Sequence, residues 1–388
     1  MKLTQIGVNA MNLLEDRYVL MNKNTPVANL IVAYNKVYIS KVLSDIPNYL
    51  GDINFWVESR MTLIGRENLK RMAKIAGIST EEEFLTISKA ISINDTFWVN
   101  DLKSPTTWEK VNPYTNRLSR IMAEMAIEGL RVYENQNLRS PSPQYRIDGV
   151  VDKCVKREHG ALYLYKTDGE KWSDLAGSRP YSEYYCSQLQ EKLKFSNFVK
   201  YNLKVDKTDK GYYKPYVYSR LFTNEKIGLV QMGMSKFAGY SIHELDRVIP
   251  DTAKIQLREM VLLDSLTLNF DRHSGNYGFL VNNDNYKIVG LAPIYDNDCA
   301  LGSMTSIQNK SFAEAINEIK NTRLPKLELG TYDDMARWAI TPDLYNKLKG
   351  LGYVKLQRIQ GLSERRTQFI EYIINTRREE ILKAVASR

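Results

Sequence analysis

The chain has 388 residues, which is enough for two or three domains or for one two-lobed domain with an extension. Hydrophobic residues make up 43% and charged residues 26%, a composition that argues against a disordered protein and predicts a sizeable core. The net charge is +9, but acidic residues are interspersed with the lysines and arginines, so nucleic-acid binding is only weakly indicated.

The cysteines and the hydropathy of the sequence indicate where in the cell the protein is expected to be found. Cys154, Cys186 and Cys299 are odd in number and widely spaced, which argues against a disulfide framework and favours a reducing cytoplasm. With three histidines beside them, a structural zinc site is not indicated. The first twenty residues lack a continuous apolar core, and no apolar run reaches the roughly 18 to 20 residues that span a bilayer. We therefore expect neither a signal peptide nor a membrane span.

The first part of the chain alternates strand-like and helical patterns. "NLIVAYNKVYI" predicts strands, and "RENLKRMAKIAG" predicts a helix that ends at its glycine. "STEEEFLTISKAI" predicts a second helix, with Ser79 and Glu82 as a capping box. The proline-rich "SPSPQ" at 140–144 separates a helix ending near Asn135 from the middle of the chain.

The middle of the chain predicts a small mixed sheet with one helix packed on it. "YRIDGVVDKCV" and "GALYLYKTDG" predict a hairpin joined by the turn "KREHG". A helix is expected next, at about 181–194, and "NFVKYNLKV" and "YYKPYVYSRLF" predict two more strands.

The chain is mostly helical from about residue 225. The strongest helix, 251–268, carries apolar residues on more than one face and is therefore expected to be buried. Asp264 in this helix then needs a partner, because an unpaired buried carboxylate is costly. "YGFLV", "NNDN" and "YKIVGLAPIYD" predict a hairpin after it.

The loop "NFDRHSGNYGFL" at 269–280 and this hairpin carry oxygen-bearing side chains in the order that phosphoryl transfer needs. Asp271 and Asn276 lie five positions apart, and the hairpin can return Asp296 to their neighbourhood. In protein kinases a loop aspartate accepts the proton of the substrate hydroxyl, an asparagine five positions later binds a metal, and an aspartate beyond a hairpin binds the metal that bridges the phosphates. Mg²⁺ prefers such hard oxygen ligands.

The same hypothesis requires a lysine on a central strand and a glutamate on the next helix. Lys166 ends "ALYLYK", and Glu183 lies in "YSEYYCSQL". Strand lysines are usually solvated, and Asp-x-x-x-x-Asn often arises by chance, so it is the order of these features along the chain that indicates a kinase. An exposed helix position stays an alternative for Glu183.

The segment "LLDSLTLNFDRHSGNYGFL" with "LAPIYDND" resembles the catalytic core of HipA-like serine/threonine kinases, bacterial enzymes known chiefly as toxins of toxin–antitoxin pairs. "ISINDTFWV" and "FWVESR" resemble the N-terminal region of a Firmicutes-type branch of that family. The family pattern is close to D-x-L-x-x-N-x-D-R-H-x-x-N-x-G-F followed by A-P-x-[YF]-D. It is met by Asp264, Leu266, Asn269, Asp271, Arg272, His273, Asn276, Gly278, Phe279, Ala292, Pro293, Tyr295 and Asp296.

This resemblance implies an α+β, two-lobed protein-kinase-like fold with a small mixed-sheet N-lobe, a mainly helical C-lobe and an N-terminal extension. We place the extension at 1–108, the N-lobe at 109–223 and the C-lobe at 224–388. The resemblance further implies a cytoplasmic bacterial enzyme that uses ATP and Mg²⁺ to phosphorylate Ser or Thr of a protein, and by analogy itself. Release from the cell stays open. It also implies an antitoxin partner.

Residue by residue, the resemblance implies that Asp271 is the catalytic base, that Asn276 and Asp296 bind Mg²⁺, and that Lys166 contacts the ATP phosphates. Adenine would bind backbone groups at the end of the "YVYSRLF" strand. The phosphate loop departs from G-x-G-x-x-G, because "IDGVVDK" has a single glycine, so backbone amides would cradle the phosphates. The expected ATP-binding residues are Gly149, Val150, Val151, Lys153, Lys166, Arg220, Leu221 and Phe222.

Other residues are expected to support the site. His273 would fix the loop through a ring hydrogen bond, and Asp264 would accept hydrogen bonds from the loop. Asp298 stands where relatives often have glycine, and it either adds an acid at the metal or faces solvent. Cys299 is expected to be inert. The candidate self-phosphorylation residues are Ser178, Ser303, Thr305 and Ser306.

Three alternatives stay open. One is a pseudokinase, or nucleotide-binding interaction module, which the single-glycine loop favours and the intact Asp271, Asn276 and Asp296 disfavour. Another is a basic nucleic-acid-binding component of a toxin–antitoxin complex. The third is a kinase for lipids or small molecules.

Overall fold

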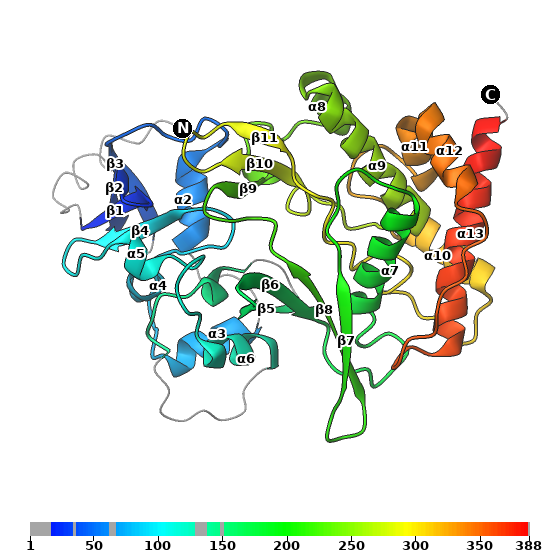
Figure 1. The fold of residues 1–388 in the computed structure, drawn as a ribbon, viewed down its shortest axis with the longest axis horizontal. Helices are drawn as coiled ribbons and strands as arrows, with labels where there is room; N and C mark the ends of the chain where they lie inside the picture. Colours follow the sequence, from blue (N-terminus) through cyan, green and yellow to red (C-terminus); the bar gives the residue numbers. More distant parts are fainter. Residues whose placement is uncertain (1–16, 34–35, 62–66, 129–137, 148–150, 387–388) are drawn as a thin grey trace.

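A computed structural model of the chain describes residues 17–33, 36–61, 67–128, 138–147 and 151–386. Three β-sheets occupy its N-terminal and central parts, and helices dominate the rest (Figure 1). The predicted α+β class is confirmed.

The first sheet is antiparallel, with the strand order β3-β2-β1-β4. Its strands are β1 (Tyr18–Asn22), β2 (Thr25–Ala33), β3 (Lys36–Val42) and β4 (Phe97–Asp101). The helices of this region are α2 (Ile53–Met61), α3 (Glu67–Ile75), α4 (Glu81–Ser88), α5 (Trp108–Val111) and α6 (Arg120–Glu128). The predicted helix end near Asn135 lies outside the described residues.

The start of α4 corrects the predicted capping box by one residue. Thr80, not Ser79, is the N-cap, and its hydroxyl accepts the backbone N–H of Glu83 at 3.1 Å. The Glu83 carboxylate reaches back to the backbone N–H of Ser79 at 2.8 Å. Two overlapping Ser/Thr-x-x-Glu matches occur in this sequence, and the second one caps the helix.

The second sheet contains β5 (Asp152–Glu158), β6 (Ala161–Thr167), β7 (Asn202–Lys207) and β8 (Tyr213–Arg220) in the order β5-β6-β8-β7. Helix α7 (Arg179–Lys192) connects β6 to β7. All pairings are antiparallel, so the expectation of a mixed sheet is wrong. The reason is that β6 and β7 run in the same direction but β8 lies between them.

The predicted first strand of this sheet begins later than expected. Pro143–Arg146 forms a 3-10 turn, which Ser142 begins by accepting the N–H of Gln144, and the strand starts only at Asp152. The proline directly after Ser142 fits the first turn of a helix, because a missing N–H costs nothing there.

The third sheet has the antiparallel order β11-β10-β9 and contains the predicted hairpin. Its strands are β9 (Ile227–Gln231), β10 (Gly278–Asn282) and β11 (Ile288–Leu291). Gly278 is needed where β10 meets β9, since a Cβ atom there would lie 2.2 Å from the carbonyl oxygen of Val230. The loop that carries Asp271 and Asn276 therefore leads into a strand whose first residue must be glycine.

The C-terminal helices are α8 (Ile242–Val248), α9 (Asp251–Thr267), α10 (Phe312–Thr322), α11 (Tyr332–Ala339), α12 (Pro342–Gly350) and α13 (Glu364–Ala386). As predicted, α9 is buried on several faces. One apolar core runs from the first sheet, through the third sheet, into these helices, and it includes Leu20, Val230, Phe279, Leu263 and Ile373. The division into an extension and two lobes at the residues given above stays a prediction.

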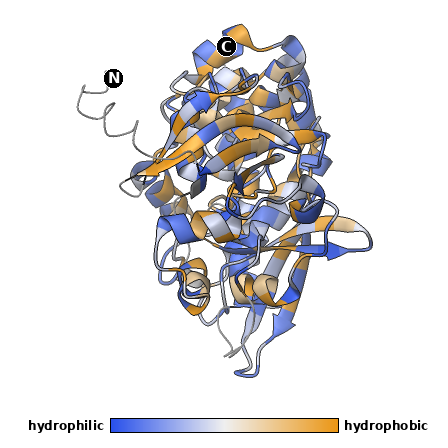
Figure 2. Ribbon diagram, turned by 90° about the vertical axis from the view of Figure 1, so that its left-hand side faces the viewer, coloured by the Kyte–Doolittle hydropathy of each residue, from blue (hydrophilic) through white to orange (hydrophobic). Residues whose placement is uncertain are grey.

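Apolar residues are distributed along many elements. Figure 2 shows hydrophobic and hydrophilic residues interleaved on strands and helices. Within the described ranges, no helix combines the length and the hydropathy that a bilayer crossing requires.

A buried ion pair fixes the segment that leads into β4. The guanidinium of Arg60, in α2, donates to Asp95 at 2.5 Å and to the carbonyls of Ala90 and Phe97 at 2.7 and 2.8 Å. Both charged side chains are buried. This pair orders the backbone around Asn94, which reaches the candidate site.

We expect Arg60→Met to lower the free energy of unfolding by about 3–5 kcal/mol, because it leaves the Asp95 carboxylate buried without its cation. Urea unfolding followed by circular dichroism measures the change. Arg120→Met is the matched control, since the Arg120 side chain is 87% exposed and its ion pair with Glu124 contributes at most about 1 kcal/mol. Equal losses for the two variants would contradict this role of Arg60.

Candidate active site

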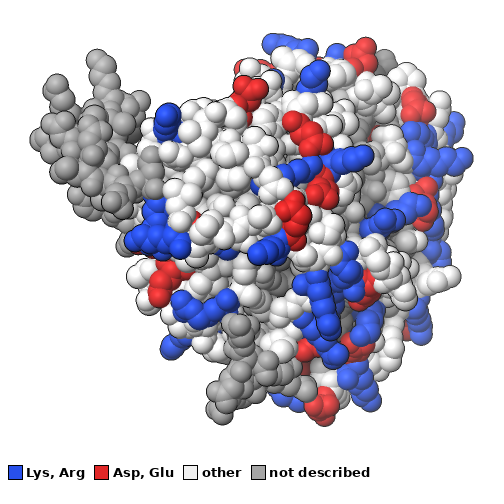
Figure 3. All heavy atoms as spheres, turned by 60° about the vertical axis from the view of Figure 1, so that its left-hand side comes forward, with Lys and Arg blue, Asp and Glu red and all other residues white. Residues whose placement is uncertain are grey.

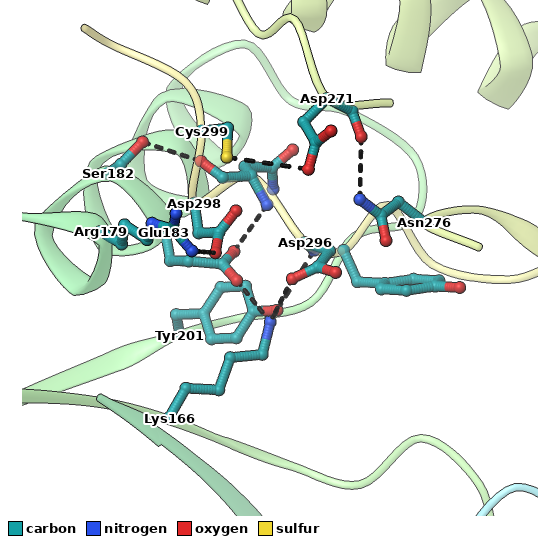
Figure 4. A network of polar contacts seen from close by, with 12 residues as sticks. Lys166, Arg179, Ser182, Glu183, Tyr201, Asp271, Asn276, Asp296, Asp298 and Cys299 are labelled. Atoms are coloured by element: carbon teal, nitrogen blue, oxygen red, sulfur yellow. Dashed lines mark hydrogen bonds and ion pairs between the residues drawn. The ribbon is translucent and has the colours of Figure 1, made fainter. Parts of the chain in front are cut away.

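The side chain of Lys166 lies between two carboxylates. Its Nζ atom is 2.5 Å from Oε1 of Glu183 and 2.7 Å from Oδ1 of Asp296 (Figure 4). The lysine and the glutamate side chains are only 6% and 1% exposed. Burial alone would lower the pKa of Lys166, but the charges of Asp296 and Glu183 outweigh it and hold this pKa well above its usual value. Lys166 therefore stays charged and joins β6, α7 and the segment after β11.

Asp296 is held in an unusual backbone conformation next to this lysine. Its φ of +59° lies in the left-handed region, which is uncommon for non-glycine residues, although aspartate adopts it more often than most. Burial would raise the pKa of its carboxyl group, but the charges of Lys166 and Lys153 hold it well below the usual range. For Glu183 burial prevails and raises the pKa. Of the two carboxyl groups that contact Lys166, Asp296 is therefore the one whose pKa its surroundings lower.

Helix α7 also fixes the chain on the far side of Asp296. The Glu183 carboxylate accepts the backbone N–H of Asn297 at 2.9 Å. The hydroxyl of Ser182 lies 2.7 Å from the carbonyl of Asn297 and 2.8 Å from that of Ala300. Neighbouring residues of α7 therefore order the segment that carries Asp296.

The loop after α9 places Asp271 and Asn276 together. Helix α9 ends at Leu268 in the left-handed conformation, which turns the chain into the loop. The side-chain amide of Asn276 donates to the carbonyl of Asp271 at 2.9 Å. One Asp271 carboxylate oxygen lies 3.8 Å from the sulfur of Cys299, and the other is 2.5 Å from Nζ of Lys326.

Arg272 ties this loop to α9 and to the Asp296 segment. Its guanidinium donates twice to Asp264 at 2.9 Å and once to the carbonyl of Asn276 at 2.9 Å. It also reaches Oδ1 of Asn297 at 2.6 Å and the carbonyl of Tyr295. Burial would lower the pKa of Arg272, but Asp264 raises it, so the cation persists in the core. Asp264 has the buried partner that the sequence required.

The remaining predicted side chains lie around this centre. Nδ1 of His273 accepts the backbone N–H of Gly275 at 3.0 Å, the kind of ring hydrogen bond that was predicted. Asp298 faces Arg179 at 3.7 Å, and burial, together with the neighbouring Asp296, raises its pKa. Burial raises the pKa of Cys299 well above its usual value, which keeps the thiol protonated.

One cavity of about 200 Å³ contains most of the predicted site residues. Those that line it are Val151, Lys153, Lys166, Arg220, Leu221, Phe222, Asp271, His273, Asn276 and Asp296. Gly149 and Val150 lie outside the described residues. A wider hollow of about 820 Å³, lined by residues such as Trp172 and Lys310, contains none of them, so the smaller cavity is the candidate active site.

The cavity also contains residues that sequence reasoning missed. Ile93 and Asn94, from the region before β4, line it together with Tyr201, and so does Tyr295, which matched the family pattern but had no role assigned. The rings of Tyr295 and Phe222 lie 5.8 Å apart at the predicted adenine end. Arg272 was matched to the family pattern, but no role was assigned to it. Arg272 follows a buried helix that carries Asp264, and this position could have indicated that the two side chains form an ion pair.

We expect Asp264→Ala to lower the free energy of unfolding by about 3–5 kcal/mol and also to lower the activity of the site, because it leaves Arg272 buried and unpaired beneath the loop. Thermal unfolding measures the first effect, and phosphotransfer from γ-labelled ATP, the activity that the sequence resemblance implies, measures the second. Asp251→Ala, in the same helix, is the control, since that side chain is 93% exposed. Normal unfolding with full activity would remove the supporting role of Asp264.

No protein-family model matches the sequence, and no curated protein matches it. The structure is similar to that of HipA from Shewanella oneidensis, solved in a toxin–antitoxin complex with HipB and operator DNA. That similarity has a TM-score of 0.50 and 14% identity over 94% of this chain and 97% of HipA. The proinflammatory kinase CtkA from Helicobacter pylori is similar with a TM-score of 0.41 and 18% identity, over 60% of this chain and 91% of CtkA.

At 14% identity, the likeness to HipA shows the fold and not the activity. It covers nearly the whole of both chains, so the N-terminal part is included as well as the part that holds the candidate site. The chain therefore has the two-lobed, protein-kinase-like fold that its sequence predicted.

Proposed function

We propose that the protein is an ATP-dependent kinase that transfers the γ-phosphoryl group of ATP to a Ser or Thr hydroxyl of a protein. The observation that carries this proposal is that one cavity holds the Lys166–Asp296 pair and the Asp271–Asn276 pair together. A cation for phosphates, oxygen ligands for a metal and a carboxylate for the hydroxyl are the groups that this reaction requires.

In the proposed reaction the acceptor hydroxyl is hydrogen-bonded to Asp271. Its oxygen forms a bond to the γ-phosphorus while its proton passes to the Asp271 carboxylate, and the bond from the γ-phosphorus to the bridging oxygen breaks to release ADP. Lys166, held by Glu183, would contact the phosphates. Backbone groups at Leu221 and Phe222 would bind adenine.

Mg²⁺ fits the residues that are present. Among the described residues, no three His, Cys, Asp or Glu side chains form a metal-binding group, but Mg²⁺ commonly takes only one or two protein ligands and completes its shell with phosphate oxygens and water. The hydrogen bond from Asn276 to Asp271 occupies the amide nitrogen and leaves the amide oxygen as a ligand. When bound to Asn276 and Asp296, Mg²⁺ would neutralise charge on the phosphates.

Accessibility separates the candidate self-phosphorylation residues. Ser178, Ser303 and Thr305 are buried, and the hydroxyls of Ser178 and Ser303 donate to the carbonyls of Asp174 and Asp298. Ser306 is half-buried. We therefore favour Ser306 if the enzyme phosphorylates itself. An antitoxin partner and a cytoplasmic location stay predictions.

The nucleic-acid alternative gains no specific support. On the face drawn in Figure 3, Lys and Arg side chains are interspersed with Asp and Glu side chains and form no continuous basic tract. Contacts to a nucleic-acid backbone usually need such a tract.

We expect the wild type to incorporate label from γ-labelled ATP with Mg²⁺, and Lys166→Met, Asp271→Asn and Asp296→Asn each to lower the rate by about 100-fold or more. The reason is that each removes one of the groups that the reaction needs. Asp284→Asn is the matched control, because Asp284 lies at the exposed turn of the hairpin that leads to Asp296 and pairs with Lys23.

Equal labelling of all these proteins would contradict the kinase proposal. A wild type that is stabilised by ATP and Mg²⁺ in thermal unfolding but labels nothing, under several metals, would instead show the pseudokinase alternative.

A further inference from the structure

Lys326, which the sequence did not indicate, contacts the proposed catalytic base. Its Nζ atom lies 2.5 Å from Oδ1 of Asp271, and its side chain is 53% exposed. Asp271 lines the nucleotide cavity, whereas Lys326 is not among the residues lining it. Lys326 therefore approaches Asp271 from outside the nucleotide cavity, where a protein acceptor would have to enter.

The backbone around Lys326 is held against the catalytic loop. Its N–H donates to the carbonyl of Phe270 at 3.2 Å, directly before Asp271 in the chain. The next residue, Leu327, is buried in the main core. The backbone of Lys326 is thus fixed, while its exposed side chain can exchange one anionic partner for another.

The segment Arg323–Lys326 is also fixed at its first residue. The guanidinium of Arg323 lies 4.9 Å from the ring centre of Phe270 and donates to the carbonyl of Met304 at 2.7 Å. Met304 belongs to the segment that comes after Asp296 and Cys299. Arg323 therefore contacts both the loop that carries Asp271 and the segment that follows Asp296.

Between these anchors, an apolar side chain faces solvent. Leu324 is 65% exposed, although the residues on either side of its segment are fixed by the core and by hydrogen bonds. A leucine displayed on an ordered backbone two positions from Lys326 presents an apolar contact beside the reacting groups. Apolar side chains that pack against a partner at a fixed position provide selectivity for that partner.

We propose that Arg323–Lys326 is the acceptor-binding edge of the active site, where Lys326 contacts the phosphoryl group in transfer and Leu324 contacts an apolar side chain of the acceptor protein. This inference rests on the proposed kinase function. In the free protein Asp271 is the partner of Lys326. When the Asp271 carboxylate takes the hydroxyl proton, its negative charge is lost and the Lys326 ammonium can stabilise the oxygens of the transferring group.

Lys326 and Leu324 are expected to affect different kinetic quantities, kcat and the preference among acceptors. Lys326→Met should lower kcat by about 100-fold, because one charged donor to the transferring group is removed, and should leave the KM for ATP unchanged, because Lys326 lies outside the nucleotide cavity. Lys326→Arg should restore part of kcat. Leu324→Glu should leave the KM for ATP unchanged and shift the acceptor preference at one position from apolar to basic.

A library of serine-containing peptides with varied flanking residues, labelled with γ-labelled ATP and Mg²⁺, tests both effects. Lys254→Met is the matched control for Lys326→Met, since Lys254 also forms an exposed pair with an aspartate, Asp251, but on the opposite end of α9 from the loop. Thermal unfolding should be unchanged in all variants, because the substituted side chains are exposed or half-exposed.

The outcomes distinguish this inference from the function on which it rests. If the wild type labels peptides and both Lys326→Met and Leu324→Glu behave like the wild type, the acceptor edge is wrong and the kinase proposal stands. If the wild type labels neither peptides nor itself, the kinase proposal falls and the inference with it. The expected split between kcat and acceptor preference supports both.

Discussion

The buried ammonium of Lys166 is the interaction on which the candidate site depends. Two carboxylates from different parts of the chain meet it, one from α7 and one from the segment after β11. Taking these charges out of water costs several kcal/mol for each ion, and only their mutual attraction offsets that cost. The second sheet, α7 and the third sheet are therefore held in one relative position by a contact whose cation is the group that we propose binds the phosphates.

A second buried cation, Arg272, fixes the position of the loop that carries Asp271, as Lys166 fixes the position of the sheets. Arg272 bonds to Asp264 beneath it and to backbone carbonyls on both sides, so the loop and the Asp296 segment share one anchor. Asp271 is itself only partly exposed and rests on this anchored loop. Such a support holds the carboxylate that we propose as the catalytic base in place without burying it in the core. A site whose reacting groups are fixed in this way is preorganised.

The sequence was sufficient for elements and features that depend on local pattern. Helix α9 and the hairpins could be predicted from periodicity and turn signals, and the order of five polar residues along the chain indicated that they lie close together: Lys166, Glu183, Asp271, Asn276 and Asp296. The cap of α4 was misplaced because two equivalent matches overlap. The second sheet was expected to be mixed because a sequence pattern does not tell which strands are neighbours.

Features of the site that depend on tertiary contact were beyond the sequence. Ile93 and Asn94 reach the cavity from far along the chain, and Lys326 meets Asp271 across 55 positions. Nothing in the local sequence of these residues distinguishes them from surface or loop residues. A motif identifies residues that act together when they are close in sequence, but it cannot show which distant residues complete their surroundings.

The segment around Asn94 shows why the N-terminal region belongs to the site. The carbonyl of Asn94 accepts the N–H of Leu229 in β9 at 2.6 Å, and the carbonyl of Ile93 accepts the hydroxyl of Thr223, just after the predicted adenine-binding residues, at 2.6 Å. Gly228 is required there, since a Cβ atom would lie 2.7 Å from the Asn94 carbonyl. Arg60 fixes the same segment from α2 through Asp95. The cavity is thus bordered by the segment that leads into the first sheet as well as by the other two sheets. A change in how the first sheet packs would therefore reach the end of the cavity where we propose that adenine binds, through two hydrogen bonds and one buried ion pair.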